Sequence, residues 1–251
     1  ESEHDAFVTG HSSTSVSLAF GVAQANRIKK SSAYSIAVIG DGSLTGGMAF
    51  EALNNAARSK ERLIVILNDN NMSISKNVGA VPRILSRLRS QKSYVRFKNV
   101  IERGAKRLPL IGGAVRNFLF RTKTFFKSIL VGSNMFEDMG FTYLGPIDGH
   151  DLDRLCNVLE WAKELRCPVV VHVNTVKGKG YPFAEENPGK YHGVSPFDPE
   201  TGLVRGTGGE TFSSVFGRAL TDCAGEDPRV CAITAAMADG TGLTNFAKTY
   251  P

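Results

Sequence analysis

Residues 35–70 contain two apolar runs with a helical pattern between them, in the stretch SIAVIGDGSLTGGMAFEALNNAARSKERLIVILNDN. The first run, 35–39, leads into the triplet GDG, which contains Asp41, and the second, 62–67, leads into NDN, which contains Asn70. This order predicts a strand, a helix and a second strand joined by a right-handed parallel crossover. Because the carboxyl ends of parallel strands meet at one edge of a sheet, we expect Asp41 and Asn70 to lie close together.

These two side chains have the chemistry of ligands for a hard divalent cation. A carboxylate and an amide oxygen, completed by water and phosphate oxygens, suit magnesium. The glycines beside Asp41 allow the backbone to approach a diphosphate closely. The alternative is a plain turn after the strand, because Gly and Asp also favour turns. The repetition of the pattern after a second strand favours the metal and diphosphate site.

The charge of the chain is positive overall but uneven. The 251 residues carry a net charge of +6, and the segment 83–127 alone contains thirteen Lys or Arg and a single acid, Glu102. A solvated helical face is the first interpretation of this segment, a lid that draws in anionic substrates the second, and a nucleic-acid contact the third. We expect no nucleic-acid partner, because the rest of the chain is acidic and no binding motif is present.

The ends and the cysteines indicate a protein that neither crosses a membrane nor uses disulfides. No charged and then apolar leader follows Glu1, and no apolar run approaches the roughly 20 residues of a membrane-spanning helix. No two cysteines have CxxC spacing, so neither a zinc site nor a redox pair is predicted. We expect buried free thiols in a reducing compartment at the four positions Cys156, Cys167, Cys223 and Cys231.

Further periodic segments extend the alternation of strands and helices, which indicates an α/β fold with a parallel sheet flanked by helices. Asp151 is expected to cap the helix that follows it. A loop is predicted at 71–81, and two or three basic amphipathic helices at 82–130. The other predicted elements are helices at 12–30, from 152 onwards, at 211–224 and at 242–249, and strands at Phe141–Leu144, Cys167–Asn174 and 229–234.

Several blocks together resemble the 1-deoxy-D-xylulose-5-phosphate synthase family, whereas the Asp41 and Asn70 pattern alone is shared with other thiamine enzymes. The resemblance covers nearly the whole chain except 82–130. Its blocks are GHSSTS (10–15), IGDGSLTGGMAFEALN (39–54), ILNDNNMSIS (66–75), LGPIDGHD (144–151), KGKGY (177–181), YHGVSPFDP (191–199) and AITAAMA (232–238).

The resemblance implies a thiamine diphosphate-binding fold and a division into domains. Residues 1–176 would form the diphosphate- and magnesium-binding domain with a basic helical insertion at 82–130, 177–210 a linker, and 211–251 the beginning of a second α/β domain that binds the pyrimidine. The chain would begin after a segment that carries a cofactor-contacting histidine and end before the glutamate that activates the aminopyrimidine. About half of the active site would then be present, and these 251 residues alone are expected to be inactive.

The activity implied is the condensation of pyruvate with D-glyceraldehyde 3-phosphate to 1-deoxy-D-xylulose 5-phosphate and carbon dioxide. The product feeds isoprenoid, thiamine and pyridoxal synthesis, and the cofactors are thiamine diphosphate and Mg²⁺. A homodimer in the bacterial cytoplasm, or in a plastid of a eukaryote, is also implied. The alternatives are another thiamine enzyme such as a transketolase, against which the 191–199 block argues, and a non-catalytic cofactor-binding or basic interaction module.

The resemblance, matched motif by motif, implies roles for three sets of residues. Asp41 and Asn70 are metal ligands through their side chains and Met72 through its carbonyl, and His192 is the catalytic residue, placed to shuttle protons. The remaining cofactor contacts implied are Gly10, His11 and Ser12 on one wall of the site, Gly42 and Ser43 at the diphosphate with Asn70, and Tyr181.

Each histidine also has a purely structural interpretation. His11 could be a helix-entry residue and His192 a hydrogen-bonded member of its loop. His150 is expected to order the turn before a helix, and His172, in an apolar strand, to be a satisfied core residue without a supporting constellation. Lys177 and Lys179 could reach a phosphate or a carboxylate, but both stay outside the predicted site, because lysines flanked by glycine are often only solvated.

Overall fold

A computed structural model describes residues 2, 4–70, 84–85, 134–204, 209–235 and 237–251. The chain divides into two compact units, and the boundary lies between Thr175 and Val176. The predicted loop at 71–81 and most of the predicted helices at 82–130 fall outside the described residues. Within the described part of the chain, no helix has the length and apolar character needed to cross a membrane.

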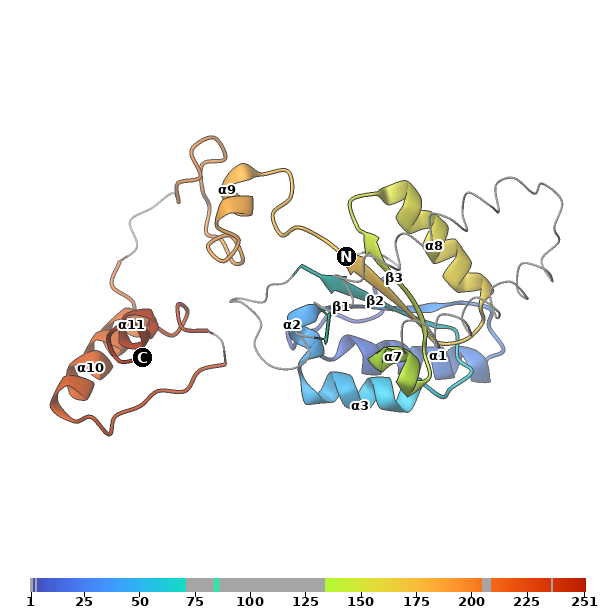
Figure 1. Cartoon of the computed structure of the whole chain (residues 1–251), viewed down its shortest axis with the longest axis horizontal. Coiled ribbons are helices and arrows are strands. Elements are labelled where there is room, and N and C mark those ends of the chain that lie inside the picture. Colours follow the sequence, from blue (N-terminus) through green and yellow to red (C-terminus); the bar gives the residue numbers. More distant parts are fainter. Residues whose placement is uncertain (1, 3, 71–83, 86–133, 205–208, 236) are drawn as a thin grey trace. The chain divides into compact units, whose positions relative to one another are not determined.

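The first unit is built on a four-stranded sheet in the order β1-β2-β4-β3 (Figure 1). Its strands are β1 (Ser35–Gly40), β2 (Leu63–Asp69), β3 (Thr142–Asp148) and β4 (Val169–Asn174). All three strand pairings are parallel. The predicted α/β fold with a parallel sheet flanked by helices is therefore confirmed.

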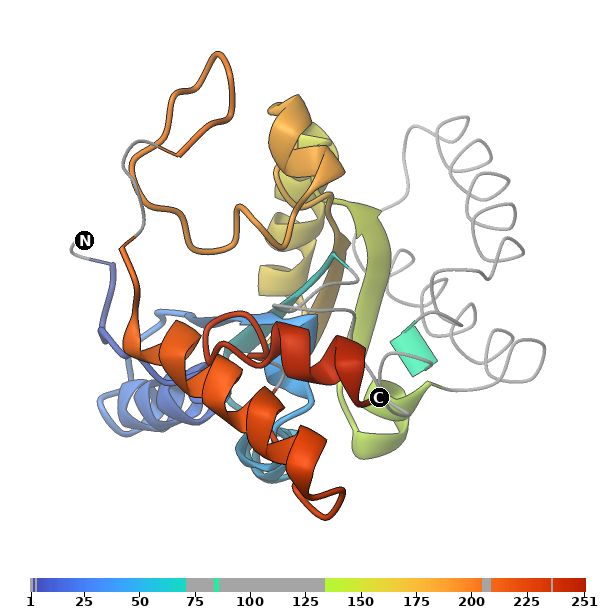
Figure 2. The same ribbon diagram turned by 90° about the vertical axis from the view of Figure 1, so that its left-hand side faces the viewer.

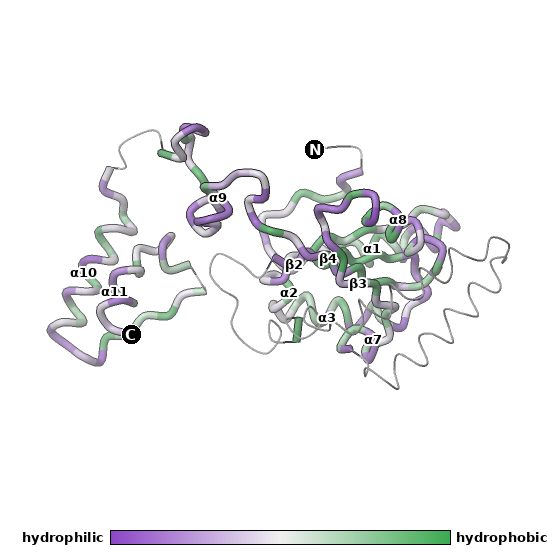
Figure 3. The backbone as a smooth tube through the Cα atoms, turned by 45° about the horizontal axis from the view of Figure 1, so that its top comes forward, coloured by the Kyte–Doolittle hydropathy of each residue, from purple (hydrophilic) through white to green (hydrophobic). Residues whose placement is uncertain are grey.

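Helices cover both faces of this sheet, and its strands are largely hydrophobic (green in Figure 3). Their apolar side chains form two cores. On one face α1 (Ser15–Ile28), α3 (Gly47–Ala56) and α7 (Met135–Met139) pack against β1, β2 and the nearby parts of β3 and β4. On the other face α8 (Leu152–Glu164) packs mainly against β3 and β4. Burial on both faces explains why β4, VVVHVN, lacks alternation.

Local signals at the ends of the helices are only partly as predicted. The Asp151 side chain accepts a hydrogen bond from the Arg154 backbone N–H at 3.1 Å, which confirms the predicted cap of α8. Helix α1 is shorter than the predicted 12–30, and its N-cap Thr14 makes no capping bond. The Thr14 hydroxyl donates instead to the His11 carbonyl at 3.1 Å, so this side chain stabilises the entry turn rather than the helix amides.

Strand β3 is longer than the predicted Phe141–Leu144 and continues to Asp148. Its register with β4 shifts between Leu144 and Ile147, where Gly145 has φ +142°. A Cβ added at Gly145 would lie 2.6 Å from the His172 carbonyl oxygen. Only glycine allows this close approach of β3 to β4, so the strand continues past a residue that would ordinarily suggest a turn.

The second unit contains α9 (Pro182–Glu186), α10 (Phe212–Glu226) and α11 (Thr244–Thr249). Helices α10 and α11, in orange and red in Figure 2, pack against each other around Ala224 and Phe246. The predicted helices at 211–224 and 242–249 are confirmed. The predicted strand at 229–234 is wrong, because a strand needs a partner and no described residue pairs with this segment.

The cysteines are free but not buried, which corrects the prediction of buried thiols. Cys156, Cys223 and Cys231 are exposed, and Cys167 is half-buried. Cys156 lies on α8, whose outer face points to solvent, so its place in a helix gave no reason for burial. The basic segment contributes a single described core residue: Leu85 is 1% exposed and belongs to the core under α1 and α3.

Candidate functional site

The carboxyl ends of β1 and β2 bring three polar side chains to one edge of the sheet. Gly40 pairs with Asn68, and Asp41 follows directly as the first residue of the short helix α2 (Asp41–Leu44). The carboxyl group of Asp41 shares a hydrogen bond with that of Asp69, the last residue of β2. Asn70 comes next and is half-buried. The predicted placement of Asp41 and Asn70 at neighbouring strand ends agrees with this geometry.

Burial and a neighbouring carboxylate disfavour the charged form of Asp41. Its pKa is raised from 3.8 to about 6, first because the group is buried and then because the charge of Asp69 is close. Hydrogen bonds from the backbone N–H groups of Gly42 and Asp41 itself act in the opposite direction. Two carboxyl groups in contact at a buried strand end form a site that a bound cation would stabilise.

Asp69 was not predicted as a site residue, and its environment extends the site into the core. Its Oδ2 lies 2.9 Å from Nε2 of His172 on β4, and both side chains are fully buried. Nδ1 of His172 lies 2.6 Å from the hydroxyl of Tyr143 on β3. His172 is thus the satisfied core residue that was predicted, but the expectation that it lacks a constellation is wrong.

A second wall of the site comes from the segment before α1. Gly10, His11 and Ser12 are exposed, and the adjacent Ser13 has φ 67°. The Ser13 hydroxyl donates to the Ser43 carbonyl at 2.7 Å and so joins this segment to the turn that contains Asp41. The structure therefore brings the two predicted walls, the one before α1 and the one in α2, side by side.

The backbone is open at one glycine near each wall. Among the described residues, no heavy atom beyond the chain neighbours lies within 4 Å of the position that a Cβ would occupy at Gly10 or at Gly40, which directly precedes Asp41. The side-chain oxygen Oδ1 of Asn174 is also buried and accepts no hydrogen bond from the described residues, at the end of β4 where Asn174 pairs with Asp69. Open glycine backbone and an unpaired buried oxygen fit a site that is completed by a bound group.

The donor set fits a cation only if the cofactor contributes ligands. Among the described residues, no group of three or more His, Cys, Asp or Glu could hold a metal ion. Asp41 supplies one carboxylate and Asn70 one amide, while Met72, the third predicted ligand, falls outside the described residues. This set suits Mg²⁺, which is bound through one or two carboxylates together with phosphate oxygens.

The two other predicted site residues lie in the second unit. Tyr181 precedes α9, and its hydroxyl donates to the Pro199 carbonyl at 2.9 Å. Its ring packs in an aromatic cluster with Phe183, Tyr191 and Phe197. These contacts fix the turn that presents the KGKGY and YHGVSPFDP blocks.

His192 is exposed, and its Nδ1 lies 2.6 Å from the ammonium of Lys177. An ammonium group has only donors, so Nδ1 must accept, and in a neutral imidazole the proton then sits on Nε2. Lys177 thereby fixes the tautomer of the predicted catalytic histidine. Lys177 was not among the predicted site residues, and the signal that could have identified it was its place in a glycine-rich turn fifteen positions before the histidine.

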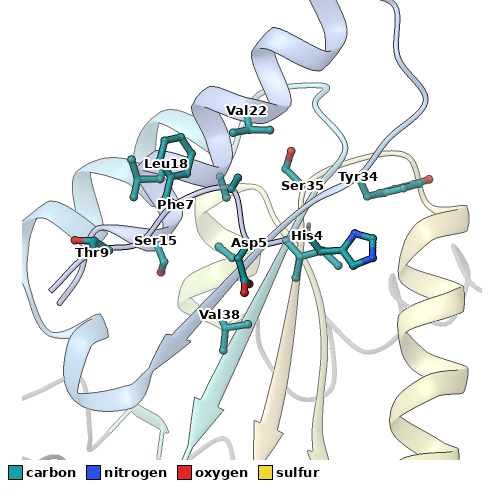
Figure 4. Close-up of a pocket in the computed structure, with 14 residues that line it drawn as sticks. His4, Asp5, Phe7, Thr9, Ser15, Leu18, Val22, Tyr34, Ser35 and Val38 are labelled. Atoms are coloured by element: carbon teal, nitrogen blue, oxygen red, sulfur yellow. The ribbon is translucent and has the colours of Figure 1, made fainter. Parts of the chain in front are cut away.

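The remaining features do not add to the site. The backbone N–H of His150 donates to Asp148 Oδ1 at 2.9 Å, so the Asp148 side chain orders the turn before α8, and a role of the His150 imidazole in this turn stays a prediction. A cavity of about 260 Å³ runs along β1 and is lined by the N-terminal segment and α1, including His4, Phe7 and Leu18 (Figure 4). It contains none of the predicted site residues.

Comparison with known proteins gives one consistent family. The family profile described as 1-deoxy-D-xylulose-5-phosphate synthase matches residues 1–175. The 1-deoxy-D-xylulose-5-phosphate synthase of Clostridium kluyveri (strain NBRC 12016) is 51% identical over 251 residues, which are 100% of this chain and 40% of that protein. The enzyme of the same name from Desulforudis audaxviator (strain MP104C) is 52% identical over the same shares.

The chain spans about two fifths of the length of these curated relatives. The profile match covers the whole sheet of the first unit and the strand ends that carry Asp41, Asp69 and Asn70. The similarity to the relatives continues through the second unit, with Tyr181 and His192. The chain therefore belongs to the 1-deoxy-D-xylulose-5-phosphate synthase family.

Proposed function

We propose that the protein carrying this chain condenses pyruvate with D-glyceraldehyde 3-phosphate to give 1-deoxy-D-xylulose 5-phosphate and carbon dioxide, the first step of non-mevalonate isoprenoid synthesis. The observation that carries the proposal is the buried pair of Asp41 and Asp69 at the ends of β1 and β2, beside Asn70. The geometry alone supports a metal and diphosphate site, and the family match of residues 1–175 supports this particular reaction. The chain itself would supply the half of the site that binds the metal and the diphosphate.

The cofactors proposed are thiamine diphosphate and Mg²⁺. Asp41 and Asn70 would hold the metal with the Met72 carbonyl. Backbone donors at Gly42 and Ser43 would face the diphosphate, and Gly10, His11 and Ser12 would form the opposite wall. Thiamine diphosphate, when bound, supplies the electron sink for decarboxylation, whereas the protein binds, orients and handles protons. The open backbone at Gly10 and Gly40 supports this arrangement.

His192 is the residue we propose for proton transfer near the reacting carbon, with Tyr181 as a further cofactor contact. With Lys177 donating to Nδ1, the neutral ring carries its proton on Nε2, which would donate a hydrogen bond to the reacting group. If Nε2 gives this proton up, Nδ1 would take one from the Lys177 ammonium, so that the ring stays neutral. Lys177 also places a positive charge beside this loop, which would attract the two anionic substrates.

The larger organisation follows from the family and is part of the proposal. Residues 1–176 would be the diphosphate-binding domain, 177–210 a linker and 211–251 the beginning of the pyrimidine-binding domain. We further propose a homodimer, located in the bacterial cytoplasm like the metabolites it would use. The relatives compared are bacterial, which favours this location over a plastid.

A product assay on the full-length protein tests the function. With Mg²⁺ and thiamine diphosphate, pyruvate and D-glyceraldehyde 3-phosphate should yield carbon dioxide and deoxyxylulose phosphate in equal amounts, measured by trapped label and mass spectrometry. A second assay, in which a ketose donor replaces pyruvate, distinguishes this activity from that of a transketolase. Two-carbon transfer from the ketose without release of carbon dioxide would contradict the proposal, as would the absence of any product.

A further inference from the structure

The first unit contains a buried row of polar side chains that extends from the proposed metal ligand Asp41 to residues without a role in the proposed reaction. It runs from Asp41 through Asp69 and His172 to Tyr143 and joins the ends of β1 and β2 to the interior of β4 and β3. Asp69, His172 and Tyr143 are each 6% exposed or less. His172 and Tyr143 are too deeply buried to touch a substrate or a cofactor. Any role that they have in the site must therefore act through Asp69.

Chemistry fixes the direction of the hydrogen bonds in this row. An ionised Asp69 has only acceptors, so Nε2 of His172 must donate to it. In the neutral ring Nδ1 is then an acceptor, so the Tyr143 hydroxyl donates to Nδ1. Each member is thereby fixed by the next, and the orientation of the Asp69 carboxylate depends on a tyrosine one strand further away.

The surroundings of His172 are apolar, so the presence of a polar side chain at this position needs an explanation. β4 reads VVVHVN, and its neighbours in the core are apolar, so a valine or leucine would satisfy packing at this position. A buried imidazole costs free energy unless its nitrogens are bonded, and its two partners are Asp69 and Tyr143. Asp69, in turn, is buried at a strand end next to Asp41. The polarity of each residue is explained by the next one towards the site.

We propose that His172 and Tyr143 are positioning residues for the metal site: they hold Asp69 in a fixed place beside Asp41, where its negative charge limits the positions open to the Asp41 carboxylate when a metal–diphosphate complex is bound. This inference rests on the proposed function, because it gives Asp41 the role of a ligand. The arrangement is the carboxylate counterpart of the hydrogen-bonded partners that orient metal ligands in proteins, whose loss weakens metal binding about 10- to 100-fold.

The proposal predicts a change in metal preference as well as in affinity. Mg²⁺ demands near-ideal octahedral geometry, whereas Ca²⁺ accepts irregular and variable coordination. If the row fixes the orientation of Asp41, loosening it must penalise Mg²⁺ more than Ca²⁺. A purely structural role would lower the stability of the protein and leave the preference between the two ions unchanged.

The test uses the full-length protein, with thiamine diphosphate binding measured by calorimetry in Mg²⁺ and in Ca²⁺, and thermal unfolding measured without metal. His172→Leu removes the donor to Asp69, and Tyr143→Phe removes a single hydroxyl. His172→Gln places an amide donor near the position of Nε2 and serves as the conservative rescue. Tyr34→Phe is the matched control, because it also removes a hydroxyl bond, to the Lys163 carbonyl, at the opposite end of β1.

His172→Leu should weaken binding in Mg²⁺ about 10- to 100-fold and in Ca²⁺ clearly less. Tyr143→Phe should show a smaller loss in the same direction, and His172→Gln should recover most of the affinity. Tyr34→Phe should bind as the wild type does. A second control, Val171→Ala, removes core volume next to His172 and should lower the unfolding temperature without changing the metal preference.

Two results would overturn the inference alone: wild-type affinity in both Tyr143→Phe and His172→Leu, or equal losses in Mg²⁺ and Ca²⁺ that follow the unfolding temperature as in Val171→Ala. If His172→Leu fails to fold, Tyr143→Phe decides by the same criteria. A wild-type protein that binds thiamine diphosphate equally with and without metal would instead overturn the proposed function, and the inference with it.

Discussion

Replacement of Asp41 by asparagine should stabilise the metal-free protein while removing its metal-dependent cofactor binding. Asp41→Asn keeps the size of the side chain and an oxygen that can accept from the Gly42 and Asp41 backbone N–H groups. It removes the negative charge that burial and Asp69 disfavour. A residue that is retained for binding at a cost in stability is expected to behave in this way.

The magnitude follows from the pKa of Asp41, which rises from 3.8 to about 6, or by about two units. At about 1.4 kcal/mol per unit, ionised Asp41 lowers the free energy of unfolding by up to about 3 kcal/mol. Below about pH 4 the carboxyl group is protonated in both the folded and the unfolded chain, so the cost is absent. It accumulates as the pH rises from about 4 to 6, where only the unfolded chain ionises, and is constant above that.

Differential scanning fluorimetry in EDTA, from pH 4.5 to pH 8, measures the effect. The unfolding temperature of Asp41→Asn should exceed that of the wild type by several degrees at pH 7.5 and by about a third as much at pH 4.5. Asp148→Asn is the control, because Asp148 is an exposed aspartate at the end of β3. A difference that does not depend on pH, or a variant less stable than the wild type at pH 7.5, would refute the reasoning.

The other predictions concern backbone geometry and proton transfer. Gly145→Ala should destabilise the protein by about 1–3 kcal/mol in chemical unfolding, because φ is +142° and a Cβ would press on the His172 carbonyl. Gly21→Ala, in the middle of α1 with open space around it, should instead stabilise by about 0.5–1 kcal/mol; equal effects would contradict this account. In steady-state kinetics, His192→Asn should lower turnover more than cofactor affinity, and wild-type turnover would leave His192 a structural residue. Lys177→Met should also lower turnover, because the His192 imidazole loses its hydrogen bond with the Lys177 ammonium.

Much of the first unit could be predicted because its signals are local. Two apolar runs on either side of a helical pattern define β1, α3 and β2, and a parallel crossover then requires Asp41 and Asn70 to lie at neighbouring strand ends. The cap at Asp151 depends on a residue three positions away, so the sequence contains the whole interaction. Such features need no knowledge of the rest of the fold.

The remainder depends on contacts between distant segments. The bond between Asp69 and His172 joins residues 103 positions apart and requires β4 to insert between β2 and β3. Alternation of strands and helices does not determine that order. The available signal was the histidine itself, a polar residue in the otherwise apolar run VVVHVN. The strand expected at 229–234 failed for the converse reason, since apolar residues form a strand only where a partner strand is present.

Calorimetric titration of the full-length protein with thiamine diphosphate, in Mg²⁺ and in EDTA, is the most direct test of the metal and diphosphate site. The account predicts binding in Mg²⁺, a large loss of affinity in EDTA, and the same loss in Asp41→Ala, with far-ultraviolet circular dichroism showing that the variant keeps its fold. Equal affinity with and without Mg²⁺, or wild-type affinity in Asp41→Ala, would show that the ends of β1 and β2 do not hold the metal.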